Sequence, residues 1–220
     1  MRRDPPGPVP FAGLPAPLRF GKGACRPVHF AKAMMSMVGD DHRNLSAGES
    51  VEFELTFLAR VLPPGLASWP SVGLIDVYIP SDRSVHPRVR LRQKGDYFEL
   101  TKKVPLAARD ASAHSEITIP LSREEYIELS GSSGRRVEKI RYAGSIDGYP
   151  AEVDVFVGAL KGLVLIDFEF GSREELDQFV VPSLCLADVT QEDFVAGGLL
   201  AGRSFSEVSN KLQKFGYVPL

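Results

Sequence analysis

The sequence predicts an α+β fold in which eight antiparallel strands close into a barrel and helices pack on the outside. Three observations support this prediction. From Val51 onward the apolar residues alternate with polar ones, turn residues separate eight such runs, and most of the links are too short for helical crossovers. Closure removes the exposed edges of a sheet, and eight strands make a barrel wide enough for one small ligand.

The strand runs follow one another along most of the chain. Turn residues such as Pro63-Pro64-Gly65, Gly95-Asp96 and Asp147-Gly148 separate them. The predicted strands cover residues 51–59, 72–80, 87–94, 96–104, 115–120, 135–143, 150–157 and 161–170.

Short helices are expected between and after the strands. Ser122 with Glu125, and Ser172 with Glu175, have the spacing of capping boxes that open helices. Near the end of the chain, apolar residues recur at helical spacing. The predicted helices are 122–130, 172–180, 190–201 and 204–215.

Residues 1–48 differ in composition from the rest of the chain. Seven prolines and several glycines fall between Arg2 and Pro27, with no usable period. Such a segment cannot bury enough surface to offset its chain entropy, so we expect a disordered or irregular tail. The folded domain is therefore predicted to span residues 49–220.

Composition excludes several classes of protein. The net charge of -2 lacks the basic surplus of a duplex-DNA binder, and Arg135-Arg136 fits a solvated strand start better than a nucleic-acid patch. No apolar run approaches the roughly 20 residues needed to cross a bilayer. Only Cys25 and Cys185 are present, which fits two unreacted thiols in a reducing cytoplasm. The oligomeric state stays open.

Charged side chains share one face of six predicted strands, because residues of equal parity point the same way. On any single strand the simplest interpretation is a solvated face. Across the six, however, charges that lie two residues apart on one face have the same sign, which favours charges that point into a lumen. The acidic candidates are Glu52, Glu54, Glu152, Asp154, Asp167 and Glu169, and the basic candidates are Arg88, Arg90, Arg92, Lys103, Lys139 and Arg141.

A lumen that carries both signs calls for a ligand that satisfies both. Carboxylates two residues apart can converge on Mg²⁺ or Mn²⁺, which prefer oxygen ligands. Arginine and lysine make charge-assisted hydrogen bonds to phosphate oxygens. The pattern therefore predicts a metal-chelated polyphosphate as the ligand.

From about Val51 to Ala201 the chain resembles the CYTH, or triphosphate tunnel metalloenzyme, superfamily. Six charged motifs and a glycine-leucine turn carry the resemblance because they occur in the family's order at compatible spacing. They are Glu52-x-Glu54, Arg90-x-Arg92, Thr101-x-Lys103, Lys139-x-Arg141, Glu152-x-Asp154, the turn from Gly158 to Leu163, and Asp167-x-Glu169.

The resemblance implies an eight-stranded tunnel that hydrolyses a triphosphate-containing small molecule with a divalent metal. Inorganic tripolyphosphate, thiamine triphosphate and nucleoside triphosphates are all possible substrates. Carried over by position, Asp154 would orient a basic group or water. The implied metal ligands are Glu52, Glu54, Asp167 and Glu169; the implied phosphate-binding residues are Arg90, Arg92, Lys103, Lys139 and Arg141; and the implied catalytic residues are Glu52, Glu54, Lys139 and Asp154.

One position departs from the family pattern. The first motif ends in lysine in the family and in Thr56 here, and a hydroxyl does not neutralise phosphate charge. Lys94 and Lys102 are candidates to compensate. Thr56 keeps a non-catalytic polyphosphate- or nucleotide-binding module open as an alternative. Adenylyl cyclase activity and a β-sandwich with a solvated charged face are further alternatives.

Overall fold

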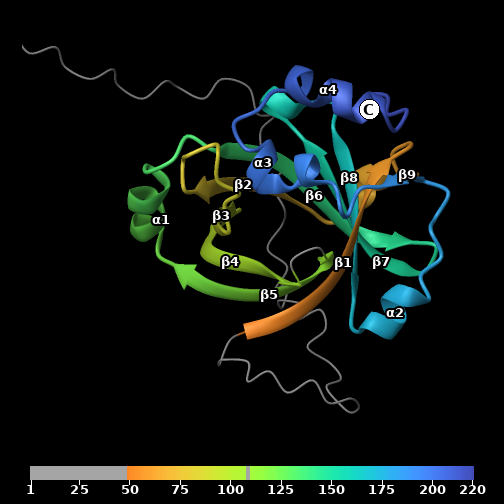
Figure 1. Ribbon diagram of the computed structural model, residues 1–220, viewed down its shortest axis with the longest axis horizontal. Coiled ribbons are helices and arrows are strands. Elements are labelled where there is room, and N and C mark those ends of the chain that lie inside the picture. The colour runs from red at the N-terminus through yellow and green to blue at the C-terminus, as the bar shows by residue number, and fades with distance from the viewer. Residues whose placement is uncertain (1–48, 108–109) are drawn as a thin grey trace, which may run out of the picture. The chain divides into compact units, whose positions relative to one another are not determined.

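The computed structural model describes residues 49–107 and 110–220 (Figure 1), so the predicted tail at 1–48 lies outside the described residues. The structure has a strand at each of the eight predicted places, which confirms the prediction made from alternating residues. The strands are β1 (Glu49–Ala59), β2 (Ser71–Ile79), β3 (Val89–Lys94), β4 (Tyr97–Ala107), β5 (Asp110–Leu121), β6 (Arg136–Ile146), β7 (Tyr149–Phe156), β8 (Val164–Phe170) and β9 (Cys185–Asp188).

The sheet is antiparallel and closes on itself. Its strands are ordered β5-β4-β3-β2-β6-β7-β8-β1, and a further pairing between β1 and β5 completes an eight-stranded barrel. The predicted closed barrel is confirmed. The short β9 was not predicted; it pairs with the last residues of β1, from Phe57 to Ala59.

The helices divide between the outer wall and one end of the barrel. They are α1 (Arg123–Ser130), α2 (Arg173–Asp177), α3 (Gly197–Leu200) and α4 (Phe205–Gln213), with short 3-10 turns η1 (Leu66–Ser68), η2 (Gly158–Leu160) and η3 (Asp193–Val195). The predicted capping box at Ser122 and Glu125 opens α1. The predicted helix at 190–201 is interrupted, because the backbone of Ala196 between η3 and α3 is not helical, with ψ at 128°.

Apolar side chains cover the outside of the barrel wall. Tyr126 of α1 packs against Val77 and Leu91 from β2 and β3. On the far wall, Phe57 and Phe168 pack beneath the segment that follows α2, and Phe168 lies 4.7 Å from Phe179 between ring centroids. The predicted arrangement of an apolar outer face is therefore present at both places.

The other helices close one end of the lumen. Leu58, Phe156 and Leu165 have the parity of the charged lumen residues but lie near the end of the barrel, where they are buried. They form one cluster with residues of η3, α3 and α4, including Phe194 and Leu212. This apolar plug leaves the charged part of the lumen as the space in which a polar ligand can lie.

None of the helices within the described ranges combines the length and the apolar character that spanning a bilayer requires.

Candidate active site

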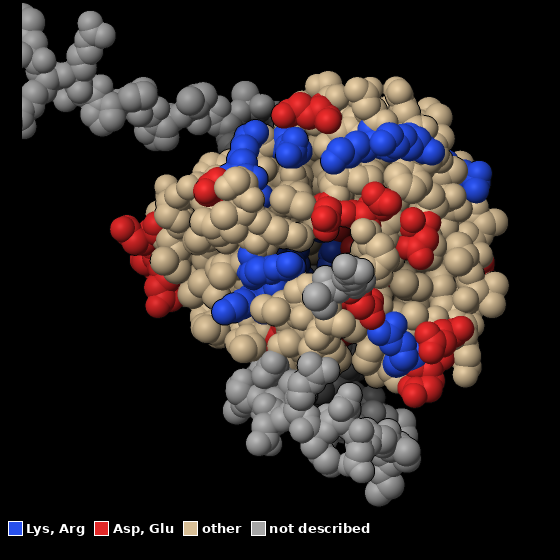
Figure 2. All heavy atoms as spheres, viewed as in Figure 1, with Lys and Arg blue, Asp and Glu red and all other residues tan. Residues whose placement is uncertain are grey.

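A cavity of 540 Å³ occupies the interior of the barrel. Basic side chains gather on one side of the hollow that Figure 2 shows, and acidic side chains lie on the other. Cavity-lining residues with a charged side chain include Glu54, Arg88, Arg90, Arg92, Lys103, Lys139, Arg141, Asp154 and Asp167. The lumen predicted from strand parity therefore exists, and it carries both signs.

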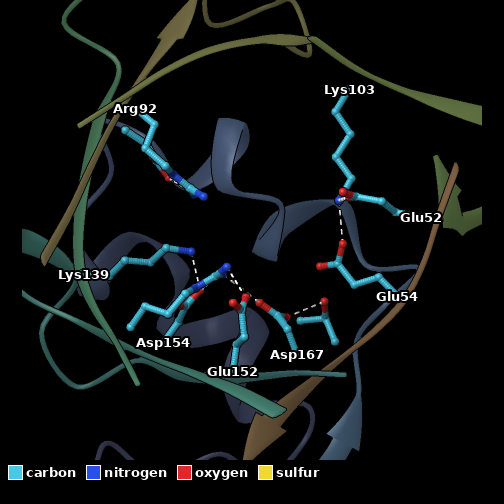
Figure 3. A network of polar contacts seen from close by, with 11 residues as sticks. Glu52, Glu54, Arg92, Lys103, Lys139, Glu152, Asp154 and Asp167 are labelled. Carbon is cyan, nitrogen blue, oxygen red and sulfur yellow. Dashed lines mark hydrogen bonds and ion pairs between the residues drawn. The ribbon is translucent and has the colours of Figure 1, made fainter. Parts of the chain in front are cut away.

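Asp154 of β7 is the centre of one group of contacts (Figure 3). It accepts hydrogen bonds from Lys139 and from Arg141, whose Nε and Nη2 lie 2.7 and 2.6 Å from its two oxygens. Burial opposes the ionisation of Asp154, but the two cations outweigh it and hold its pKa well below the ordinary value. Asp154 therefore fixes the orientation of two basic side chains.

Lys103 of β4 reaches across the lumen to β1. Its Nζ lies 2.5 Å from an oxygen of Glu54 and 3.3 Å from an oxygen of Glu52. Burial disfavours the charged form of Glu54, yet the Lys103 ammonium lowers the pKa of this carboxyl to about 2. Three predicted site residues from two distant strands, β1 and β4, thus meet in one ion-paired group.

Arg92 of β3 has a partner that the sequence did not point to. Its Nε and Nη2 donate to the two oxygens of Asp76, directly opposite on β2, at 2.7 and 2.8 Å. Asp76 was missed because it is the only charged residue of an apolar strand. Since Asp76 engages two of its nitrogens, Arg92 has less capacity for phosphate than the sequence predicted.

Arg88 and Arg90, which we call the arginine pair, are not neutralised in this way. Both line the cavity, and among the described residues no carboxylate oxygen lies within 4.0 Å of either guanidinium. Arg90 donates a long 3.5 Å hydrogen bond to Thr101 and also contacts the Tyr78 hydroxyl, while its Nε is buried without an acceptor among the described residues. A buried donor without an acceptor is costly, so the arginine pair offers free anion-binding capacity.

Four carboxylates gather on the opposite side of the barrel, which β7, β8 and β1 form, and Glu54 is the one of the four that lines the 540 Å³ cavity. This acidic cluster consists of Glu52, Glu54, Glu152 and Glu169, with Glu54 and Glu169 paired directly across β1 and β8. Burial, followed by repulsion from the three other carboxylates, raises the pKa of Glu169 to about 7. Oxygen ligands in a negative, partly buried cluster fit a hard divalent cation.

The acidic cluster is engaged with cations of the chain itself. Glu52 and Glu54 turn to Lys103, and Glu152 contacts Arg141. Within the part of the chain that the structure describes, no three acidic, histidine or cysteine side chains are gathered into a ready-made metal site. A metal ion would therefore bind by drawing carboxylates away from these ion pairs.

Thr56 occupies the place of the family lysine. Its hydroxyl donates a 2.8 Å hydrogen bond to Asp167, which faces it across β1 and β8. Arg141 contacts the other Asp167 oxygen at 3.2 Å, so both oxygens of this predicted metal ligand are already engaged. Lys94 and Lys102 are exposed and do not line the cavity, so neither replaces the missing ammonium group.

Some lumen residues gave no clear sequence signal. Tyr78 and His114 line the cavity, and the Nδ1 of His114 is buried without a partner; alternation from Asp76 and from Glu116 would have placed both on the lumen face. Arg135 and Arg136 were both predicted to be solvated. Arg136 is exposed, but Arg135 is buried because backbone carbonyls surround its guanidinium.

One known protein is similar in sequence to most of the described part of the chain. The chain is 34% identical to the inorganic triphosphatase of Nitrosomonas europaea over 145 residues, which are 64% of this chain and 90% of that protein. No family model matches the chain.

Solved structures agree with the sequence comparison. The crystal structure of the inorganic triphosphatase NE1496 superposes with a TM-score of 0.51 at 30% identity, over 68% of this chain and 93% of that one. A second structure, of the hypothetical protein NE1496, gives a TM-score of 0.52 at 31% identity, over 70% and 99% of the two chains. With the closed barrel and its two-signed lumen, these similarities show that the chain belongs to the CYTH superfamily of triphosphate tunnel metalloenzymes.

Proposed function

We propose that this protein hydrolyses a triphosphate inside the barrel, with inorganic tripolyphosphate as the first substrate to test. The observation that carries the proposal is the arginine pair, which faces the cavity without a carboxylate partner among the described residues while an acidic cluster lies on the opposite wall. A triphosphate chelated to a divalent cation complements both walls at once. The inorganic triphosphatase relative supports the choice of substrate.

The basic residues would bind and orient the phosphate chain. Arg90 donates to phosphate oxygens without first breaking an ion pair. Lys103, Lys139 and Arg141 exchange part of their contacts with carboxylates for contacts with phosphate. Asp154, held by two cations, keeps Lys139 and Arg141 aimed at the substrate. Such positioning provides most of the catalysis in phosphoryl transfer, because the protein has little covalent chemistry to perform.

Glu52, Glu54 and Glu169 would hold the divalent cation, Mg²⁺ or Mn²⁺, with Asp167 as a further ligand if it leaves Thr56. When bound, the cation would neutralise phosphate charge and lower the pKa of a water molecule. In the overall reaction, water attacks the terminal phosphorus and the bond from that phosphorus to the bridging oxygen breaks. Tripolyphosphate then yields orthophosphate and pyrophosphate.

A second function is favoured by one observation. Because Thr56 gives its hydroxyl to Asp167, the lumen lacks one ammonium group of the family pattern. Losing a contact that stabilises transition-state charge costs about 2–4 kcal/mol. The alternative is therefore a module that binds polyphosphate or nucleotide without hydrolysing it.

A substrate panel tests the proposal. The purified chain is incubated with tripolyphosphate, thiamine triphosphate or ATP, each with Mg²⁺ or Mn²⁺, and released orthophosphate is measured. We expect turnover of at least one triphosphate, loss of that turnover in a Glu52→Ala, Glu54→Ala double variant, and little change in Glu138→Gln, whose carboxylate is exposed. Turnover no higher than in the double variant would refute hydrolysis.

Calorimetry separates the two functions. Binding of tripolyphosphate without turnover would select the binding module, and a Thr56→Lys variant that gains hydrolysis would support the same conclusion. Cyclic AMP formed from ATP would instead reveal a cyclase.

A cytoplasmic location is also proposed. It is supported by the two cysteines of the whole chain, of which Cys185 is a buried free thiol. Recovery of the native protein in a membrane or secreted fraction would contradict it.

A further inference from the structure

Arg135 lies just before β6 and is buried, with 4% of the residue exposed. Its Nη1 donates to the carbonyl oxygens of Asp82 and Val85 at 2.7 and 2.8 Å. Its Nη2 donates to the carbonyl oxygen of Gly198 at 2.6 Å. No carboxylate of the described residues lies within 4.0 Å of it. Burying a cation whose partners are carbonyl oxygens and no carboxylate costs free energy of desolvation. The burial of Arg135 therefore suggests a specific structural role.

The carbonyls belong to two segments that form part of the cavity wall. Asp82 and Val85 lie in the β2–β3 loop, which continues through His86 and Pro87 to Arg88, and these three residues line the cavity. Gly198 lies in α3 and also lines the cavity. Arg135 therefore joins the loop that leads into the arginine pair to the helix beside it.

The two segments pack so closely that there is no room for a side chain on Gly197 or Gly198. A Cβ on Gly198 would lie 2.6 Å from Cγ of Pro87, and a Cβ on Gly197 would lie 2.2 Å from the hydroxyl oxygen of Tyr78. The backbone of α3 thus packs against the Pro87 ring of the loop and the Tyr78 side chain of β2 as closely as glycine allows. A planar guanidinium with several fixed donors can hold both backbones at once, which a single ammonium group does less well.

We propose that Arg135 is a positioning residue that places Arg88 against the phosphate chain of the substrate. This inference rests on the proposed function. Arg88 follows the buried Pro87 directly, so a shift of the loop moves the Arg88 backbone and with it one half of the arginine pair. Arg135 itself contacts carbonyls and not the substrate.

The adjacent arginine provides a matched control. Arg136 is exposed, and within the described ranges its side chain pairs with that of Glu138 alone, at 2.8 Å, where the Glu138 side chain is 39% exposed. Arg135→Met and Arg136→Met remove the same donors at neighbouring positions, with contacts to the cavity wall lost in only one case. Arg135→Lys keeps the charge and part of the donor set, and it carries the test if Arg135→Met fails to fold.

The experiment measures kcat and KM for tripolyphosphate in these variants, in Arg88→Ala and in Arg88→Ala combined with each Arg135 variant. We expect KM to rise on the order of tenfold in Arg135→Met, since hydrogen bonds to charged groups are among the stronger ones, with kcat nearly unchanged. Arg135→Lys should recover part of the loss, and Arg136→Met should match the unmodified chain. If Arg135 acts through Arg88, adding its variant to Arg88→Ala should raise KM no further.

Two results would overturn the inference. KM effects of Arg88 and Arg135 that multiply would show independent roles. An Arg135→Met chain that binds and hydrolyses tripolyphosphate like Arg136→Met would show no positioning role, and if Arg135→Met does not fold, the same result for Arg135→Lys would show it. Both leave the proposed function intact. An unmodified chain that neither binds nor hydrolyses tripolyphosphate would instead refute the proposed function together with this inference.

Discussion

Replacing Asp76 with asparagine removes the charge that neutralises Arg92 in the barrel wall. The Arg92 and Asp76 side chains are 9% and 1% exposed and share two hydrogen bonds. Removing one partner of a buried pair costs about 3–5 kcal/mol, because a desolvated charge is left behind. We expect a loss of about 3 kcal/mol in the free energy of unfolding for Asp76→Asn, since the amide oxygen still accepts one hydrogen bond.

Urea denaturation measures this loss against a matched pair. Arg136 and Glu138 make a similar contact at 2.8 Å, but their side chains are 45% and 39% exposed. Exposed pairs contribute about 0.2–1 kcal/mol, so Glu138→Gln should lose no more than that. An Asp76→Asn loss as small as the Glu138→Gln loss would refute the argument that burial makes the Arg92 pair important for stability.

The same variant predicts a pH dependence. Burial opposes the ionisation of Asp76, but the hydrogen bonds from Arg92 outweigh it and lower the pKa of this carboxyl. A lowered folded-state pKa gives stability that is present above the ordinary value of about 3.9 and is lost as the pH falls further. The stability difference between the unmodified chain and Asp76→Asn should therefore be constant near neutral pH and shrink below about pH 4. A difference that stays constant to pH 2 would contradict this account.

Two further predictions concern packing and buried hydrogen bonds. A Cβ on Gly144 would lie 2.3 Å from the Trp69 ring, so Gly144→Ala should lower the free energy of unfolding by about 1–3 kcal/mol. In the control Gly73→Ala the Cβ meets nothing within 4 Å, so that free energy should change little. Equal losses of the two variants in urea denaturation would contradict the clash. Tyr217→Phe removes the oxygen that accepts a 2.8 Å hydrogen bond from the buried Val164 N–H, which should cost about 1–3 kcal/mol in thermal or urea unfolding, and an unchanged midpoint would argue that another acceptor replaces it.

The strands and the lumen were predictable because alternation is a local property that every strand repeats. The sign of the charges on each strand then indicated which faces look inward. The ends of elements were harder to predict. The first residues of β5, from Asp110 to Ala113, lack the bulky residues that mark a strand, and β9 has only four residues. It is a strand because β1 extends beyond its pairing with β5, which ends at Phe53, so that β9 can pair with Phe57–Ala59 on the same side of β1.

The pairing of charges was beyond the sequence. Alternation placed Glu54, Lys103 and Asp167 inside the barrel, but it says nothing about which side chains meet across the lumen. The Lys103–Glu54 contact depends on the curvature of the barrel, and the Thr56–Asp167 contact depends on the register between β1 and β8. Asp76 was missed and Arg135 was wrongly predicted to be solvated for a related reason, because the partners of each lie elsewhere in the chain.

Strand β1 joins both edges of the sheet, pairing with β8 along one side and with β5 along the other. The same strand carries Glu52 and Glu54. A chain that lost β1 would keep seven strands with two open edges, which invite aggregation. Loss of β1 would thus remove the two carboxylates that would hold a divalent cation and would also lower the solubility of the chain.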